Sequence, residues 1–141
     1  MVFHSVNCLA GIEVTSDAFD KLIGRPNQYT LVMFYAPWCP HCQTSKPKYL
    51  EAAKQIEKLD STKSLAMVDC DNQKNTELCQ AHSIESYPTI KLYFEGKLVQ
   101  EYENEVNEKK ITDFMKTPPK PDGQPTLAAI DINSKVTSPS K

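Results

Sequence analysis

Two cysteines three positions apart, Cys39 and Cys42, lie where an apolar stretch meets a long helical pattern. Residues 30–35 are apolar and favour a strand, and residues 43–59 repeat with the period of a helix. Backbone N–H groups at the start of a helix lack partners within the helix, and the positive end of its dipole favours a thiolate. The second sulfur lies one turn further along, within reach of a disulfide bond. The spacing therefore predicts a redox-active dithiol.

A structural zinc site is the main alternative for this pair of cysteines. Tetrahedral zinc needs a second pair of ligands at short spacing. The other cysteines are Cys8, Cys70 and Cys79, and no two of them have such a spacing. We therefore expect no bound metal, and the sequence carries no nucleotide or flavin signature that would indicate a cofactor.

Composition limits the class of protein. A chain of 141 residues with 40% apolar residues is long enough to bury the core of one domain. Its formal net charge is −2 and its charges are scattered, which argues against nucleic-acid binding. Apolar runs are too short for a membrane span, and residues 1–8 lack the pattern of a signal peptide. These residues are therefore expected to belong either to a cytosolic chain or to a mature fragment without its targeting segment. Five cysteines in a chain of this size favour an oxidising compartment.

Hydrophobic patterning predicts alternating strands and helices, followed by a hairpin and a final helix. Ser16 is expected to cap the first helix and Asn107 the last. The strand at 30–35 is apolar on both faces, which predicts a central position in a sheet covered by helices on each side. The second helix is expected to bend at Pro47 and to bury one apolar stripe, formed by Leu50, Ala53, Ile56 and Leu59. The predicted strands span 12–14, 30–35, 65–68, 89–94 and 98–102, and the predicted helices lie at 16–23, 43–59, 75–82 and 107–116.

The domain boundaries follow from changes in composition. Residues 1–9 form an N-terminal extension, and residues 10–116 contain all the predicted elements. Half of the prolines fall within 117–141, which predicts a proline-rich linker or disordered tail. Residues 126–130 could alternatively serve as a short interaction segment, although composition favours an unstructured end.

The residues around the dithiol resemble the active site of protein disulfide isomerases, in the run Phe34-Tyr35-Ala36-Pro37-Trp38-Cys39-Pro40-His41-Cys42. Pro47 stands where that family bends its active-site helix. Tyr87-Pro88-Thr89 is similar to the family's cis-proline loop. The resemblance covers about residues 10–116. It implies the thioredoxin fold, an α/β fold with a central mixed sheet flanked by helices on both faces.

The dithiol residues take distinct roles. Cys39 is the expected nucleophile, and Cys42 is the resolving thiol that attacks the mixed disulfide to release Cys39. The start of the helix, with Pro40 and the imidazole of His41 between the two cysteines, is expected to lower the pKa of Cys39. The alternative for His41 is a surface residue without a role. Pro40 is less usual in the family than glycine, and with Met33 it is similar to the third catalytic domain of an isomerase-related protein with several such modules.

Three further residues are expected to contact substrate. Trp38 and Tyr87 are expected to form an apolar rim around the dithiol, and ordinary half-buried aromatic residues would satisfy the same pattern. The resemblance implies that Pro88 is cis. An extended substrate chain could then pair with the backbone of Tyr87 in the manner of a β-strand.

Two departures from the family concern a proton acceptor. Related catalytic domains place a buried acid at the position of Met33, and many pair it with a lysine at the position of Met67. Replacing both charges is coherent, because one alone would lose its partner in a low-dielectric interior. The acid is thought to accept the proton of the resolving thiol. Its absence puts fast resolution by Cys42 in doubt.

The remaining cysteines and histidines are peripheral to the dithiol. In several isomerase domains cysteines near Cys70 and Cys79 form a structural disulfide, and this bridge is preferred here over two free thiols. Cys8 is expected to be free or paired with a neighbouring module. His4 and His82 are expected to be solvated.

These inferences predict a thiol–disulfide oxidoreductase, an oxidase or isomerase that acts on cysteines of unfolded or misoxidised proteins. A reductase of the thioredoxin or glutaredoxin type is one alternative, and a substrate-binding module with chaperone-like activity is another. The redox partner could be an oxidase or glutathione. Kinship with the isomerases implies a module of a multi-domain protein in the lumen of the endoplasmic reticulum or another secretory compartment.

Overall fold

Five strands form one mixed sheet in the computed structural model, which describes residues 11–121. Their spatial order is β1-β3-β2-β4-β5, with β1, β2 and β3 parallel to one another and β4 antiparallel to both β2 and β5. The order of the elements along the chain confirms the predicted α/β fold with a central mixed sheet. The strands are β1 (Ile12–Glu13), β2 (Tyr29–Tyr35), β3 (Lys63–Asp69), β4 (Thr89–Phe94) and β5 (Lys97–Tyr102).

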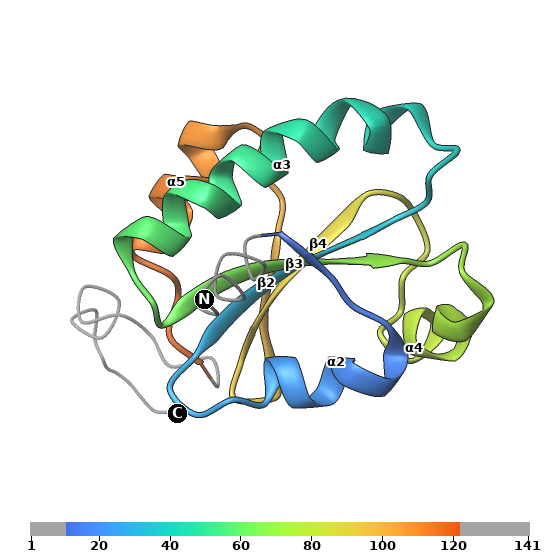
Figure 1. Ribbon diagram of the computed structural model, residues 1–141, viewed down its shortest axis with the longest axis horizontal. Helices are drawn as coiled ribbons and strands as arrows, with labels where there is room; N and C mark the ends of the chain where they lie inside the picture. Colours follow the sequence, from blue (N-terminus) through green and yellow to red (C-terminus); the bar gives the residue numbers. More distant parts are fainter. Residues whose placement is uncertain (1–10, 122–141) are drawn as a thin grey trace, which may run out of the picture.

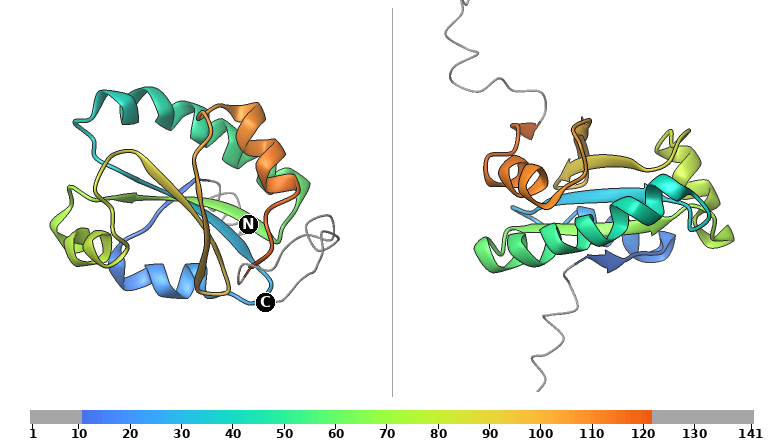
Figure 2. Two further views of the ribbon diagram at one scale, coloured as in Figure 1. Left: turned by 180° about the vertical axis from the view of Figure 1, so that it is seen from behind. Right: turned by 90° about the horizontal axis from the view of Figure 1, so that it is seen from above.

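Helices cover both faces of this sheet (Figure 1). The long helix α3 (Pro40–Leu59) and the last helix α5 (Glu108–Lys116) lie on one face. The opposite face is covered by α2 (Ser16–Ile23) and α4 (Thr76–Ala81), which follows the short 3-10 turn η1 (Gln73–Asn75). The view from behind in Figure 2 shows the same two layers.

The central strand β2 contributes to two separate cores, because successive side chains point to opposite faces of the sheet. Met33 belongs to the core beneath α3 and α5, together with Tyr49 of α3. Phe34 belongs to the core beneath α2, where it packs against Phe19 at 6.1 Å between ring centroids. Both faces of β2 are therefore buried, as its continuous apolar sequence predicts.

Of the two predicted helix caps, one is confirmed and the other is wrong. The side chain of Asn107 accepts a hydrogen bond from the N–H of Lys110 at 2.7 Å, so it caps α5 as expected. The prediction for Ser16 is wrong, since Thr15 is the N-cap of α2 and Ser16 is its first residue. The hydroxyl of Ser16 instead donates to the carbonyl oxygen of Lys74 at 2.8 Å, which ties α2 to η1.

Helix α3 begins three residues earlier than predicted. Pro40 is its first residue, a position that suits proline because the first N–H of a helix has no partner within the helix. Pro47 lies inside the helix. Of the predicted stripe, Ala53 and Ile56 are buried and Leu50 is partly buried, whereas Leu59 is exposed. The other buried residues of the helix are Cys42, Tyr49 and Ala52.

The hairpin of β4 and β5 is joined by a two-residue turn. Glu95 and Gly96 have φ angles of 50° and 88°, and Lys97 belongs to β5 rather than to the turn. After α5, the carbonyl of Pro119 accepts a hydrogen bond from the hydroxyl of Tyr29 at 3.3 Å. Cys8 and the segments at 1–9 and 126–130 lie outside the described residues, so the proposed extension and tail stay predictions.

Candidate active site

Cys39 lies at the junction between β2 and α3, where the sequence places it. It is the N-cap residue of α3, and its carbonyl oxygen accepts a hydrogen bond from the N–H of Gln43 at 3.0 Å. Its thiol donates to the carbonyl oxygen of Tyr87, with 3.6 Å between sulfur and oxygen. Cys39 is 7% exposed and Cys42 is 1% exposed, and neither forms a disulfide. The more accessible cysteine is thus the one at the start of the helix.

The two thiols differ in acidity. The backbone N–H of Cys42 lowers the pKa of Cys39 most, and the thiol of Cys42 and the backbone N–H of His41 lower it further. Burial raises the pKa of Cys42 to about 11, with a contribution from the neighbouring sulfur of Cys39. This difference favours a thiolate at Cys39 and a protonated thiol at Cys42, which is the arrangement that a nucleophile and a resolving thiol need.

His41 and Pro40 are both exposed on the first turn of α3. The contribution of His41 to the acidity of Cys39 comes from its backbone N–H, and its imidazole does not enter among the causes of the lowered pKa. A tuning role for the imidazole therefore stays a prediction. Pro40 acts locally by starting the helix, so that the next N–H groups point toward the sulfur.

An aromatic rim borders Cys39. The rings of Trp38 and Tyr87 meet edge to face, with 5.9 Å between centroids and 88° between planes. Trp38 is 62% exposed, and its indole N–H donates to a carboxylate oxygen of Asp71 at 3.3 Å. The peptide bond between Tyr87 and Pro88 is cis. The structure thus brings the expected substrate-contacting residues together beside the reactive sulfur, and their role stays a prediction.

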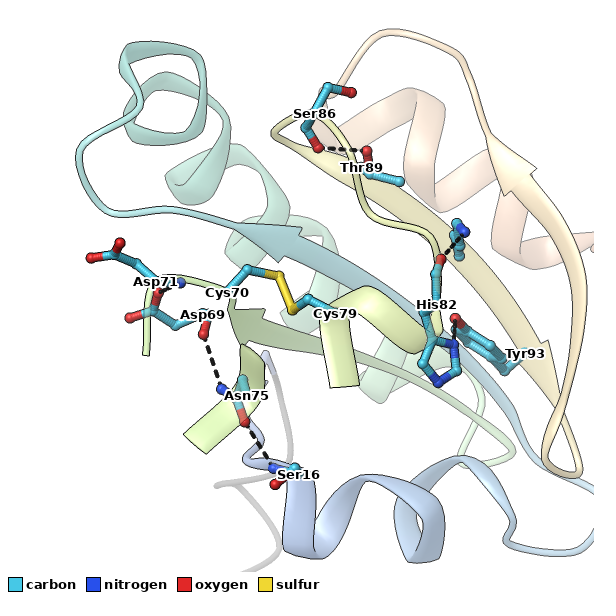
Figure 3. The surroundings of a disulfide bond; sticks show 11 residues. Ser16, Asp69, Cys70, Asp71, Asn75, Cys79, His82, Ser86, Thr89 and Tyr93 are labelled. Carbon is cyan, nitrogen blue, oxygen red and sulfur yellow. Dashed lines mark hydrogen bonds between the residues drawn. A yellow bond between two sulfur atoms is a disulfide. The ribbon is translucent and has the colours of Figure 1, made fainter. Parts of the chain in front are cut away.

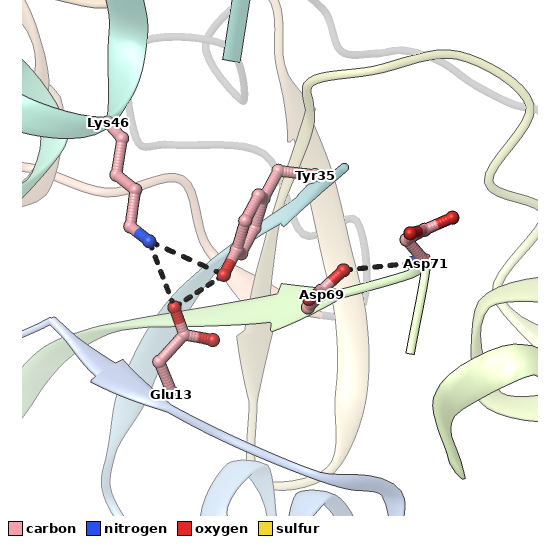
Figure 4. A network of polar contacts seen from close by, with 5 residues as sticks. All are labelled: Glu13, Tyr35, Lys46, Asp69 and Asp71. Carbon is pink, nitrogen blue, oxygen red and sulfur yellow. Dashed lines mark hydrogen bonds and ion pairs between the residues drawn. The ribbon is translucent and has the colours of Figure 1, made fainter. Parts of the chain in front are cut away.

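A cavity of about 200 Å³ opens beside the buried thiol. Its lining residues are Tyr35, Ala36, Pro37, Cys42, Gln43 and Lys46. A polar cluster borders it, in which the hydroxyl of Tyr35 donates to the carboxylate of Glu13 at 2.6 Å (Figure 4). The ammonium of Lys46 lies 3.3 Å from the same carboxylate oxygen. No pattern in the sequence predicts this cluster as a whole, although the spacing of four residues between Cys42 and Lys46 indicates a shared helix face.

The two methionines that depart from the family are direct neighbours. Met33 of β2 pairs with Met67 of β3 in the register of the parallel strands, and both side chains are buried. The structure therefore has two apolar side chains side by side where the family resemblance implies an acid and a lysine.

Cys70 and Cys79 form a disulfide bond, with 5.9 Å between their Cα atoms (Figure 3). The bond connects the end of β3 to α4. Nearby, the side-chain amide of Asn75 donates to the carbonyl oxygen of Asp69 at 3.0 Å and accepts from the N–H of Ser16 at 2.8 Å. This region therefore holds α4 to the sheet by one covalent and several polar links.

The expectation that His82 is solvated is wrong. Its ring packs edge to face against Phe19 at 5.0 Å between centroids, and its Nδ1 lies 2.8 Å from the hydroxyl of Tyr93 (Figure 3). Burial is the main cause that lowers the pKa of His82, and the charge of Lys91 adds to it. The half-buried ring lies against this aromatic core just after the end of α4, a contact that local sequence does not indicate.

Two kinds of site are absent from residues 11–121, the part of the chain that the structure describes. Within this part of the chain, no group of three or more histidine, cysteine or acidic residues could hold a metal ion. None of the helices described there is both long enough and apolar enough to cross a membrane.

Known proteins are similar to this chain in sequence and in fold. The chain is 42% identical over 93 residues to protein disulfide-isomerase A5 of Mus musculus, which covers 66% of this chain and 18% of that protein. A crystal structure of human ERp44 superposes with a TM-score of 0.70 at 28% identity, covering 75% of this chain and 28% of that chain. The Trx4 domain of ERdj5 gives a TM-score of 0.63 at 29% identity, covering 76% of this chain and 93% of that domain.

These similarities cover most of this chain and a small part of each curated relative. The chain spans about a fifth of the length of the curated relatives that it matches. The match to the thioredoxin family runs from residue 10 to residue 117, which includes every strand and helix of the structure. This chain therefore belongs to the thioredoxin family, and its relatives include protein disulfide isomerases.

Proposed function

We propose that this chain is a catalytic domain of the protein disulfide isomerase type, which exchanges disulfide bonds with cysteines of folding proteins. The observation that carries the proposal is the opposite shift of two neighbouring thiols. The pKa of Cys39 is lowered at the start of α3, whereas the pKa of the buried Cys42 is raised to about 11. A stabilised thiolate at Cys39 favours the reduced form of the pair, so the oxidised pair readily gives its disulfide to a substrate.

Both directions of exchange follow from this arrangement. In oxidation, a substrate thiolate attacks the Cys39 sulfur of the Cys39–Cys42 disulfide, and Cys42 leaves as a thiolate that takes up a proton. A second substrate thiolate then displaces Cys39, which leaves the substrate oxidised and the pair reduced. In isomerisation, the Cys39 thiolate attacks a substrate disulfide to form a mixed disulfide. Cys42 can then release the substrate by attacking the Cys39 sulfur.

The substrate is proposed to lie along the aromatic rim. Trp38 is exposed and contacts Tyr87, and this apolar surface suits the side chains of an unfolded polypeptide. The carbonyl oxygen of Tyr87 lies close to the Cys39 sulfur, so a chain that extends past Tyr87 and Pro88 would bring its own cysteine to the nucleophile.

We place the domain in a larger protein of a secretory compartment, such as the lumen of the endoplasmic reticulum. The isomerase relatives that it matches are about five times as long as the matched region, which supports a multi-module context. The Cys70–Cys79 disulfide supports an oxidising compartment. Unfolded or misoxidised proteins are the proposed substrates, and the residues carry no indication of the redox partner.

The test uses the reduction potential together with refolding of a scrambled disulfide protein. We expect a potential near the −180 mV typical of protein disulfide isomerase, well above the −270 mV of thioredoxin. Cys39→Ser should abolish refolding, Cys42→Ser should accumulate mixed disulfides, and the control Cys8→Ser should behave as the parent. A potential close to that of thioredoxin would indicate a reductase instead. Equal activity of parent and both dithiol variants would indicate a binding module without catalysis.

A further inference from the structure

Three residues from β1, β3 and β2 lie in one row across the sheet, and two of them share a core cluster with the resolving thiol of Cys42. In this row Glu13 of β1 pairs with Met67 of β3, and Met67 pairs with Met33 of β2. Residues that pair directly in parallel strands point to the same face of the sheet. Met33 and Met67 both belong to the core beneath α3, so Glu13 is aligned on the α3 side. A carboxylate is therefore present in the same row as the two methionines, at the edge strand rather than at the centre.

This carboxylate is held in place by two neighbours. The Tyr35 hydroxyl donates to it at 2.6 Å, and the Lys46 ammonium lies 3.3 Å away. The same ammonium donates to the Tyr35 oxygen at 3.4 Å and lies 4.8 Å from the centre of the Tyr35 ring. Figure 4 shows the three side chains converging from β1, β2 and α3. We call Glu13, Tyr35 and Lys46 the Glu13 cluster.

The Glu13 cluster borders the cavity that contains the resolving thiol. Tyr35, Lys46 and Cys42 all line this cavity of about 200 Å³. Lys46 follows Cys42 by four residues on α3, so the two side chains lie on the same face one turn apart. A space of this volume, with the polar side chains of Tyr35, Gln43 and Lys46 among its lining residues, is large enough to admit several water molecules, which can carry a proton between groups that do not touch.

We propose that Glu13 receives the proton of Cys42 through solvent in this cavity when the mixed disulfide is resolved, with Tyr35 and Lys46 as its positioning residues. The inference rests on the proposed function. The Cys42 thiol loses its proton to water, and water passes a proton to the Glu13 carboxylate. The Cys42 thiolate attacks the Cys39 sulfur, the Cys39–substrate bond breaks, and the Cys39–Cys42 bond forms. The departing substrate thiolate takes up a proton, so a substrate disulfide is reduced as the dithiol is oxidised.

Other charged and titratable groups surround the thiol and could contribute to its pH dependence. Cys39 faces it from the start of α3, and Asp69 of β3 pairs with Tyr35 across the sheet. The carboxylate of Asp69 already accepts a hydrogen bond from the N–H of Asp71 at 2.9 Å. Glu13 is the acid that contacts two groups lining the cavity, and it is 49% exposed, so it can return its proton to solvent.

The test follows the reaction of the reduced protein with one equivalent of dithiobis(nitrobenzoate), in a Cys8→Ser background. Attack by Cys39 releases one thionitrobenzoate, and attack by Cys42 on the resulting mixed disulfide releases the second. We expect Glu13→Gln to slow the second release about tenfold or more at pH 6 and to leave the first release unchanged. The second release should also become steeper with pH and approach tenfold per pH unit, because hydroxide then has to deprotonate the thiol.

Matched variants separate proton transfer from structural effects. Glu51→Gln removes a carboxylate from another ion pair of α3, with Lys54 at 3.4 Å, and should change neither release. Glu13→Asp should restore part of the second rate. The inference is overturned if Glu13→Gln leaves the second release unchanged between pH 5 and 8, or slows both releases equally. If the parent protein shows no second release at any pH, the proposed function fails as well, so the two failures are distinguishable.

Discussion

Removal of the Cys70–Cys79 disulfide is expected to lower the free energy of unfolding by about 2.6 kcal/mol. The two cysteines are separated by nine positions, and closing a loop of this length in the unfolded chain costs that amount in the loop-entropy treatment. The equilibrium constant for unfolding should rise about 80-fold, which corresponds to a urea midpoint about 1–2 M lower. The six-residue helix α4 is too short to be stable alone, so we expect the effect to be largest there.

The assay is urea unfolding of Cys70→Ala/Cys79→Ala, in a background of Cys8→Ser, Cys39→Ser and Cys42→Ser that prevents disulfide exchange. The single variant Cys70→Ala also opens the loop, while it keeps the sulfur of Cys79 in the core. Loop entropy therefore predicts that single and double variants lose nearly the same free energy. A loss below about 1 kcal/mol in the double variant, or a loss found only when Cys79 is replaced, would refute the reasoning.

The buried side chain of Tyr49 and the half-buried side chain of His82 give two further tests of stability. Tyr49→Phe should cost about 1–2 kcal/mol, because the buried hydroxyl lies 2.7 Å from the carbonyl oxygen of Leu31 and 2.9 Å from that of Ala66. Tyr29→Phe, with a more accessible hydroxyl, is the control and should cost less in the same urea titration. His82 has a folded-state pKa below its unfolded value of about 6.5, so the unfolded chain binds the proton first as pH falls. Its contribution to stability is present above that pH and is lost as pH falls toward the folded-state pKa. Unfolding measured at pH 7.5 and 5.5 should show a smaller decrease for His82→Gln than for the parent, and equal decreases would contradict the assignment.

Features that depend on neighbours in sequence could be predicted, and features that depend on the register of distant strands could not. The dithiol at the start of α3 and the Asn107 cap each depend on a few consecutive residues, and both are where the pattern indicates. The Glu13 cluster combines residues from three elements, so its formation depends on the alignment of β1 with β3 and of α3 over the sheet. The packing of His82 could not be predicted for the same reason, since its partner Tyr93 lies on a separate strand.

The position of the Glu13 cluster reflects the cost of burying charge. A carboxylate and an ammonium in the centre of the sheet would lose most of their hydration, and the attraction between them often does not recover that loss. In this chain the corresponding positions are Met33 and Met67, which pack within the core without such a penalty. Glu13 and Lys46 are 49% and 38% exposed, so their ion pair retains much of its hydration. The same exposure weakens their field at Cys42, because solvent screens the charges. A proton can still pass from Cys42 to Glu13 through water in the cavity. Proton transfer, rather than direct electrostatic stabilisation of the thiolate, is therefore the role expected of Glu13.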